Sequence, residues 1–164
     1  MIRVIIISGH PASGKTTVSK AIAEKLGNRW KHLSIDDFLR PYFSRMEPGV
    51  KPLAYDNIRS VACNFIKYGY NLIVEGRLFF QEKYLSQFMR YLGRKGIGFA
   101  VFELNVPEKE ALRRNRLRDV SERKPDEKIV HFHRNFEPCC SKRLIRIQND
   151  DLEETCRIML EAAR

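Results

Sequence analysis

The sequence has 164 residues, of which 43% are hydrophobic and 30% are charged. Its length suits one domain with a real core (residues 1–164), and its composition excludes disorder as the default state. The longest apolar run near the start, Val4–Ile7, is too short for a membrane span or a signal-peptide core. We therefore expect a cytoplasmic protein with no membrane partner.

The charge of the chain is basic and uneven. The formal net charge is +10, and residues 109–146 hold 12 Lys and Arg against 6 Asp and Glu. This balance suits acidic partners such as nucleotides or nucleic acid, although a phosphate-binding site alone also needs many cations. The four cysteines include no Cys-x-x-Cys, so we do not expect a disulfide framework, a redox role or a zinc site.

Apolar runs alternate with helical patterns along the chain, which predicts an α/β fold with a parallel sheet. The first run is almost continuous Val and Ile, as in a strand buried on both faces. Five strands are expected: Arg3–Ser8, His32–Ile35, Asn71–Glu75, Phe99–Asn105 and Leu144–Gln148. Helices are expected between them, with apolar stripes at Val18–Leu26, Ile58–Ile66, Leu85–Leu92 and Ile129–Phe136, and after a cap at Asp150 or Asp151.

A glycine-rich motif follows the first expected strand and opens the first expected helix. It reads Gly-x-x-x-x-Gly-Lys-Thr over residues 9–16, in the context that confirms a phosphate-binding P-loop. The glycines let backbone N–H groups converge on phosphate oxygens, and the following helix adds its positive end. We expect Lys15 to reach the β- and γ-phosphates of ATP or GTP, and the Thr16 hydroxyl to ligate Mg²⁺. The expected nucleotide-binding residues of the loop are Gly9, His10, Pro11, Ala12, Ser13, Gly14, Lys15, Thr16 and Thr17.

Two adjacent aspartates, Asp36 and Asp37, stand at the carboxyl end of the second expected strand. In a parallel α/β sheet the ligand site lies at those ends, so a carboxylate here would face the γ-phosphate. It could orient the acceptor hydroxyl and take its proton, or hold a water molecule of Mg²⁺. An N-cap for the next helix is the structural alternative, and two aspartates permit both roles. We favour Asp36 as the catalytic residue, with Asp37 on the acceptor side.

Glu75 ends the third expected strand in Leu-Ile-Val-Glu-Gly, which resembles a Walker-B segment with Glu in place of Asp. An acid at this point commonly holds Mg²⁺ through water, and a simple strand-end turn residue is the equal alternative. Which of Asp36, Asp37 and Glu75 is the base, and which holds Mg²⁺, stays open from the residues alone.

A run of arginines follows the fourth expected strand. Arg114 and Arg118 are four residues apart and share a helix face. Arginines over the phosphates neutralise charge on a transferring phosphoryl group. A solvated basic face would be the default for such a run alone. After a P-loop and a fourth strand we favour a helical lid over about residues 114–125, mobile without ligand, whose closure excludes water.

Taken in this order, the motifs resemble those of the P-loop kinases of small acceptors. These include the phage-type polynucleotide 5′-kinases, zeta toxins, chloramphenicol phosphotransferase, and the gluconate and shikimate kinases. The resemblance spans most of the chain and is strongest to the phage polynucleotide kinases. It implies a three-layer α/β/α fold with a five-stranded parallel sheet in the order 2-3-1-4-5. It also implies that Asp36 is the general base, that Arg118 contacts the transferring phosphoryl group and that Arg114 lies near the nucleotide.

Two positions depart from the polynucleotide kinase pattern. That family has an Arg three residues after the base, whereas this chain has Leu39 there and Arg40 one residue late. Its third strand ends in an Asp-Thr/Ala-Asn type of sequence, whereas this chain has Glu75, Gly76 and Arg77. We expect Arg40 and Arg77 to bind the acceptor.

The expected activity is transfer of the γ-phosphoryl group of ATP or GTP to an acceptor hydroxyl. A polynucleotide 5′-hydroxyl or a nucleoside is narrowly favoured as the acceptor, because of the basic charge and the match in the lid. The alternative is a small-molecule acceptor such as a nucleotide, a sugar or an antibiotic. A nucleotide-dependent switch or ATPase without an acceptor is the third candidate, and the guanine-binding string Asn-Lys-x-Asp of GTPases does not occur.

Overall fold

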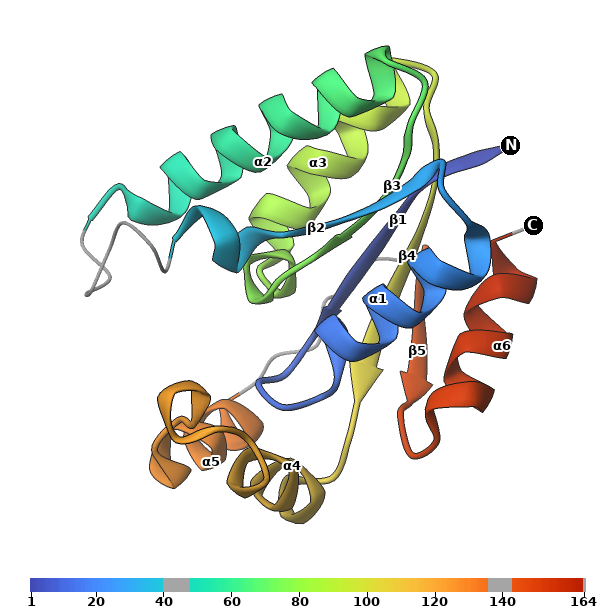
Figure 1. Ribbon diagram of the computed structural model, residues 1–164. Coiled ribbons are helices and arrows are strands. Elements are labelled where there is room, and N and C mark those ends of the chain that lie inside the picture. The colour runs from blue at the N-terminus through green and yellow to red at the C-terminus, as the bar shows by residue number, and fades with distance from the viewer. Residues whose placement is uncertain (40–47, 136–142, 164) are drawn as a thin grey trace.

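The computed structural model describes residues 1–39, 48–135 and 143–163 (Figure 1). Strands and helices alternate along the described chain, as the sequence predicted. The strands are β1 (Ile2–Gly9), β2 (Trp30–Ser34), β3 (Asn71–Glu75), β4 (Gly98–Asn105) and β5 (Leu144–Gln148). The α-helices are α1 (Lys15–Leu26), α2 (Val50–Lys67), α3 (Glu82–Arg94), α4 (Glu108–Arg116), α5 (Asp126–Arg134) and α6 (Leu152–Ala162). Short 3-10 helices are η1 (Ile35–Phe38), η2 (Arg77–Phe80) and η3 (Val120–Glu122).

The five strands form one parallel sheet in the order β2-β3-β1-β4-β5. The expected strand order is therefore confirmed, and the expected bounds of β3 and β5 match those observed. The second strand differs, because Ile35 was expected to end it and instead begins η1. The Ser34 hydroxyl accepts a hydrogen bond from the backbone N–H of Asp36 at 3.3 Å, and this local bond turns the chain out of the strand.

Two layers of helices cover the sheet, with α2 and α3 on one face and α1 and α6 on the other (Figure 1). The alternation of side chains along β1 fills both sides. Val4 and Ile6 pack with α2 and α3, whereas Ile5 and Ile7 pack with α1 and α6, and all four are 0% exposed. Full burial of such side chains contributes about 1.5–3 kcal/mol each, so the central strand is held firmly from both faces.

The carboxyl ends of the strands meet at one edge of the sheet. Ser34 of β2 lies in register with Glu75 of β3, and Glu75 lies in register with Ile7 of β1. The glycine-rich loop, η1 and η2 follow these three strands directly. Helices α4 and α5 stand at the same edge (Figure 1). Most of the residues that the sequence singled out therefore lie on elements that meet at this edge, while Arg40 falls outside the described residues.

Within residues 1–39, 48–135 and 143–163, no helix is both long enough and apolar enough to span a membrane.

Candidate active site

The glycine-rich loop between β1 and α1 folds around its own lysine. The Lys15 ammonium donates to the backbone carbonyl oxygens of Gly9 at 3.0 Å and His10 at 2.7 Å. Ala12 has φ 63°, a left-handed conformation that non-glycine residues rarely adopt. Strain of this kind concentrates at ligand-binding sites. The loop is thus wrapped tightly at the first turn of α1, where backbone N–H groups and the helix end attract an anion.

Asn149, in the turn between β5 and α6, holds this loop. Its side-chain Nδ2 donates to the carbonyl oxygen of Ser13 at 2.7 Å, and its Oδ1 accepts from the Thr155 hydroxyl at 2.9 Å. Gly14 has φ 90°, and a Cβ there would lie 2.5 Å from the Asn149 Nδ2. The second glycine of the motif is therefore required by its conformation and by this close approach. No local spacing in the sequence indicates this role of Asn149, which lies more than a hundred residues from the loop that it holds.

Glu75 is the buried acid of the site and is only 3% exposed. Its Oε1 accepts a hydrogen bond from the Thr16 hydroxyl at 2.9 Å and lies 3.5 Å from the His32 Nε2 on the neighbouring strand. Burial opposes the ionisation of Glu75. Hydrogen bonds from His32, Ser34 and Thr16, together with the charge of Lys15, outweigh burial and hold the pKa of Glu75 below its usual value. Glu75 is therefore a fixed anion beside the P-loop.

The structure brings Thr16 and Glu75 together, as a shared metal site requires, and it adds His32 as a partner that sequence reasoning missed. The sequence offers no clear signal for His32, because β2 also contains the polar residues Lys31 and Ser34. The glycine after Glu75 also has a reason, because a Cβ at Gly76 would lie 2.8 Å from the Ile35 side chain.

The two aspartates of η1 occupy different environments. Asp36 lines the cavity beside the P-loop, and its charge acts on both Lys15 and Arg77. Asp37 is exposed and does not line that cavity. Ser34 supplies the side-chain cap of η1, and Gly49 stands at the N-cap of α2, so the alternative in which an aspartate caps the next helix does not hold. The Ser34 hydroxyl is buried at the end of β2, where it accepts a hydrogen bond from the backbone N–H of Asp36.

A cavity of about 330 Å³ opens between the P-loop, η1, the start of α2, the turn into η2 and the lid. Its charged lining is strongly basic. Six cations, from five separate parts of the chain, face two carboxylates. The cations are Lys15, Lys51, Arg77, Arg118, Lys124 and Lys128, and the carboxylates are Asp36 and Glu75. Sequence reasoning missed Lys51, Lys124 and Lys128, because isolated lysines on helices and loops look the same as solvent-exposed ones.

The electrostatics of Lys15 follow from this crowding. Burial, together with the nearby charges of Arg118 and Arg77, lowers the pKa of the Lys15 ammonium to about 8, against the opposing effect of Glu75 and Asp36. A bound anion would relieve this unfavourable environment. The site is thus charged in a way that favours phosphate oxygens next to Lys15.

Arg77 connects the cavity to α5. Its guanidinium lies 4.3 Å above the ring of Phe132, and it also lines the cavity beside Asp36. Burial lowers the pKa of the Arg77 guanidinium, while the charge of Asp36 acts in the opposite direction. The stacking fixes the guanidinium plane at the mouth of the cavity, as expected for a residue that meets an anionic ligand.

The segment after α4 closes on itself through Asn115. The buried Asn115 side chain donates to the carbonyl oxygen of Lys124 at 2.7 Å and accepts from the Lys124 N–H at 3.1 Å. This pair of bonds defines the loop that carries Arg118. Arg114 donates to Glu110 at 2.6 Å and to the carbonyl oxygen of Asn149 at 2.7 Å, so it lies next to the P-loop. The expected lid residues are therefore brought to the site, while lid motion stays a prediction.

The ring of His10 packs the P-loop onto α5. Its ring stacks on His133 with 4.2 Å between centroids and meets Phe80 edge-on at 5.0 Å. Burial, His133 and Lys15 lower the pKa of His10 to about 4, so the ring is neutral near pH 7. The His10 backbone carbonyl, rather than the ring, is the part that contacts Lys15.

A second cavity, of about 390 Å³, lies on the other side of the P-loop. Both volumes fall in the range of small-molecule sites. The two cavities share the lining residues Ala12 and Arg118, so the loop separates two neighbouring binding spaces. The second is lined by Gly14, Thr17, Arg114 and Asn149 among others.

Thr16 and Glu75 provide the oxygen donors that Mg²⁺ prefers. Among the described residues, no group of three or more His, Cys, Asp or Glu side chains could hold a metal ion alone. This sparse set fits Mg²⁺, which usually takes one or two protein ligands and completes its shell with phosphate oxygens and water.

The fold and this site together define the class of the protein, a small P-loop kinase-type domain with the parallel sheet order 2-3-1-4-5. A family model described as an AAA domain matches residues 4–139, and the chain belongs to that family. No curated protein matches the sequence.

Solved structures share the fold at low sequence identity. The gluconokinase of Sinorhizobium meliloti 1021 has a TM-score of 0.76 and 16% identity, with 98% of this chain and 90% of that chain covered. The Mycobacterium tuberculosis APS kinase, solved with AMPPNP and APS, has a TM-score of 0.71 and 15% identity over 98% and 96% of the two chains. The shikimate kinase of Bacteroides thetaiotaomicron has a TM-score of 0.64 and 20% identity over 97% of each chain. The expected P-loop kinase fold is confirmed.

Proposed function

We propose that the protein is a kinase that transfers the γ-phosphoryl group of ATP or GTP to the hydroxyl group of an acceptor. The observation that carries the proposal is the pair of cavities on either side of the P-loop, which meet at Ala12 and Arg118. The cavity beside Asn149 takes the nucleotide, and the basic cavity beside Asp36 takes the acceptor. A switch or plain ATPase needs no second cavity with a carboxylate at this position.

In this proposal the residues have distinct roles. The P-loop amides and Lys15 bind the β- and γ-phosphates, and Arg118 neutralises charge on the transferring group. Asp36 orients the acceptor hydroxyl and accepts its proton. Thr16 and Glu75 hold Mg²⁺, which supplies charge neutralisation on the phosphates when bound. Arg114 lies beside the nucleotide.

The acceptor class follows from charge. Lys51, Arg77, Lys124 and Lys128 add four cations to the acceptor cavity beyond those needed at the γ-phosphate. An acceptor that carries an anion next to its hydroxyl would satisfy them. A polynucleotide 5′-hydroxyl end has such an anion, its first phosphodiester, so we favour it over a free nucleoside. Arg40 stays a predicted acceptor-binding residue, whereas Asp37, which does not line this cavity, is expected to contribute little to acceptor binding.

A small anionic metabolite is the second candidate. The acceptor cavity of about 330 Å³ suits a small ligand, and the fold is shared with a gluconokinase and an APS kinase.

The test is a transfer screen with labelled ATP and GTP. It offers 5′-hydroxyl DNA and RNA oligonucleotides beside nucleosides, nucleoside monophosphates, sugar acids and antibiotics. Label on the oligonucleotide end supports the favoured acceptor, and label only on a small acid supports the second candidate. Nucleotide hydrolysis with no labelled acceptor of any class contradicts the kinase proposal.

A further inference from the structure

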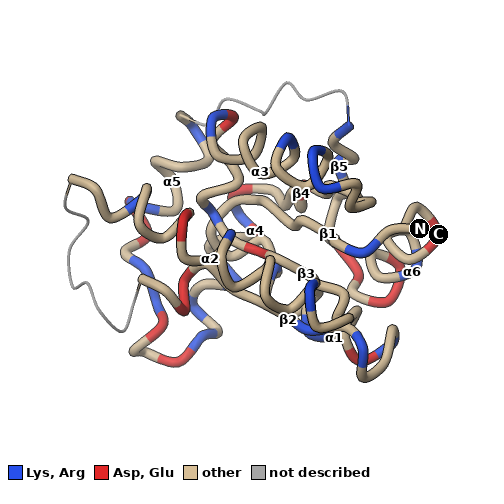
Figure 2. The backbone as a smooth tube through the Cα atoms, turned by 90° about the horizontal axis from the view of Figure 1, so that it is seen from above, with Lys and Arg blue, Asp and Glu red and all other residues tan. Residues whose placement is uncertain are grey.

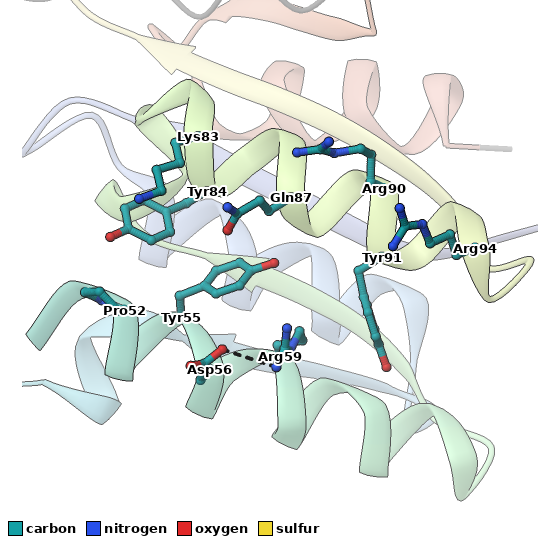
Figure 3. Close-up of a pocket in the computed structure, with 10 residues that line it drawn as sticks. All are labelled: Pro52, Tyr55, Asp56, Arg59, Lys83, Tyr84, Gln87, Arg90, Tyr91 and Arg94. Atoms are coloured by element: carbon teal, nitrogen blue, oxygen red, sulfur yellow. Dashed lines mark ion pairs between the residues drawn. The ribbon is translucent and has the colours of Figure 1, made fainter. Parts of the chain in front are cut away.

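A groove lies between α2 and α3, on the sheet face away from α1 and α6 (Figures 1 and 3). It has a volume of about 540 Å³, and none of its lining residues lines the two cavities beside the P-loop. Helix α2 contributes Tyr55, Asp56 and Arg59, and helix α3 contributes Lys83, Arg90 and Arg94. Tyr55 and Asp56 lie four and three residues before Arg59, and the three cations of α3 are seven and four residues apart, so the positions on each helix share one face. We call this hollow the α2–α3 groove.

The charged side chains that line the groove are mostly positive. Four cations line it against one carboxylate, Asp56, which lies 3.2 Å from the Arg59 guanidinium. Arg59 is also held between two aromatic rings, 5.7 Å from the centroid of Tyr55 and 5.8 Å from that of Tyr91. Figure 3 shows these rings spanning the space between the helices. In Figure 2, Lys and Arg positions recur along α3, whose single acidic residue, Glu82, lies at its start.

The cations form a row rather than a cluster. Lys83, Arg90 and Arg94 extend over eleven helical steps, which correspond to about 16 Å along α3. A single small anion draws its cations toward one point. A row of this length instead matches a linear polyanion with several charges in sequence.

The groove begins where the acceptor cavity ends. Lys51 of α2 and Gln81, the residue just before α3, line the acceptor cavity, whereas Pro52 of α2 and Lys83 of α3 line the groove. The first turns of α2 and α3 therefore border both spaces. A chain whose terminal hydroxyl lies at Asp36 would meet the row of cations as it leaves the cavity.

We propose that the α2–α3 groove binds the phosphodiester backbone of a single-stranded nucleic acid whose 5′-hydroxyl end occupies the acceptor cavity. This inference rests on the proposed function. Guanidinium groups form paired hydrogen bonds with phosphate oxygens, and backbone contacts of this type carry no sequence information. The groove therefore gives affinity that rises with strand length and does not depend on base sequence.

The experiment measures both binding and transfer. Fluorescence anisotropy gives the Kd of single-stranded DNA with a 5′-hydroxyl end and a 3′ label, in lengths from about two to about twelve nucleotides. Transfer from labelled ATP gives the KM of the same strands. The groove variant is R90Q/R94Q, and the matched control is K20Q/R29Q, which removes two exposed cations elsewhere on the surface. Circular dichroism and melting temperature verify folding, and R59Q alone provides a second, milder groove variant.

The wild type is expected to bind the long strand more tightly than the short one. In R90Q/R94Q the ratio of long-strand to short-strand Kd rises about tenfold, and the slope of log Kd against log salt falls by about 1.4. The control variant keeps the wild-type ratio. The proposal that the groove binds nucleic acid is overturned if the affinity of the wild type does not rise with strand length. It is also overturned if R90Q/R94Q keeps the wild-type ratio, as the control variant does. A third outcome is length-dependent binding that R90Q/R94Q weakens, with no transfer of phosphate to any strand. This outcome supports nucleic-acid binding in the groove and overturns the proposal that a nucleic acid is the acceptor.

Discussion

The two cavities beside the P-loop are built in different ways. The nucleotide side consists of P-loop backbone groups and buried hydrogen bonds, such as those of the Asn149 side chain with Ser13 and Thr155. The acceptor side consists of long cationic side chains, including Lys51, from distant elements. Buried hydrogen bonds tolerate little change, whereas exposed side chains can be exchanged one at a time. We therefore expect the first side to determine nucleotide binding and the second side to determine which acceptor is used.

The largest effect is expected in the P-loop, at Lys15. Replacing Lys15 by Met removes the cation beside the phosphates while keeping an apolar stem of similar length. We expect kcat to fall by about a thousandfold, because one lost electrostatic donor in such a site has an effect of this order. Steady-state kinetics measures it. A fall of less than tenfold would contradict the role of Lys15.

Asn149→Ala tests whether the clamp on the loop matters for both stability and binding. The substitution leaves the Ser13 carbonyl and the Thr155 hydroxyl without this partner in a buried place. We expect a loss of about 1–3 kcal/mol in the free energy of unfolding and a roughly tenfold weaker nucleotide Kd. Denaturant titration and calorimetry measure the two. Asn135→Ala, at an exposed position, is the control.

The pH dependence of nucleotide binding tests the contact between Lys15 and the phosphates. Burial places the pKa of Lys15 near 8 in the free protein, and phosphate oxygens favour its charged form. Binding should take up a proton above that pH, and affinity should fall as pH rises, by about tenfold at one unit above the pKa. Calorimetry in buffers of different ionisation enthalpy measures the uptake. A nucleotide affinity that stays constant from pH 7 to pH 9.5 would contradict the proposed contact of Lys15 with the phosphates.

A smaller and more selective effect is expected on the acceptor side. Arg77→Gln keeps a polar side chain but removes the cation that stacks on Phe132 at the cavity mouth. We expect the KM for the acceptor to rise about fivefold, with little change in nucleotide Kd, since a partly exposed charge contact contributes about 1 kcal/mol. Kinetics at varied acceptor and fixed ATP measures it. An equal rise in both constants would show that the two sides are not separable.

The sequence predicted one side of the site much better than the other. Gly9 through Thr17 form a contiguous motif, so the P-loop could be predicted from local spacing, and the strand order followed from the family resemblance that the motifs carry. Asn149, His32 and Lys51 act through contacts between distant segments, and no local spacing indicates such contacts. The sequence pattern placed Ile35 in the second strand, whereas it begins η1. That difference also depends on a side-chain contact, the hydrogen bond that the Ser34 hydroxyl accepts from the backbone N–H of Asp36.

The role of Asp36 as the base of the transfer reaction is tested by a comparison of two adjacent substitutions, Asp36→Asn and Asp37→Asn. Only Asp36 lines the cavity with Lys15, so the two differ in position more than in chemistry. Rapid-quench transfer with labelled ATP and the acceptor found in the screen measures the chemical step, and calorimetry measures ATP binding. We predict that Asp36→Asn lowers transfer by about a hundredfold or more with ATP binding intact, while Asp37→Asn stays within a few-fold of wild type. Near wild-type transfer by Asp36→Asn would contradict the account and move the role of base to Asp37 or Glu75.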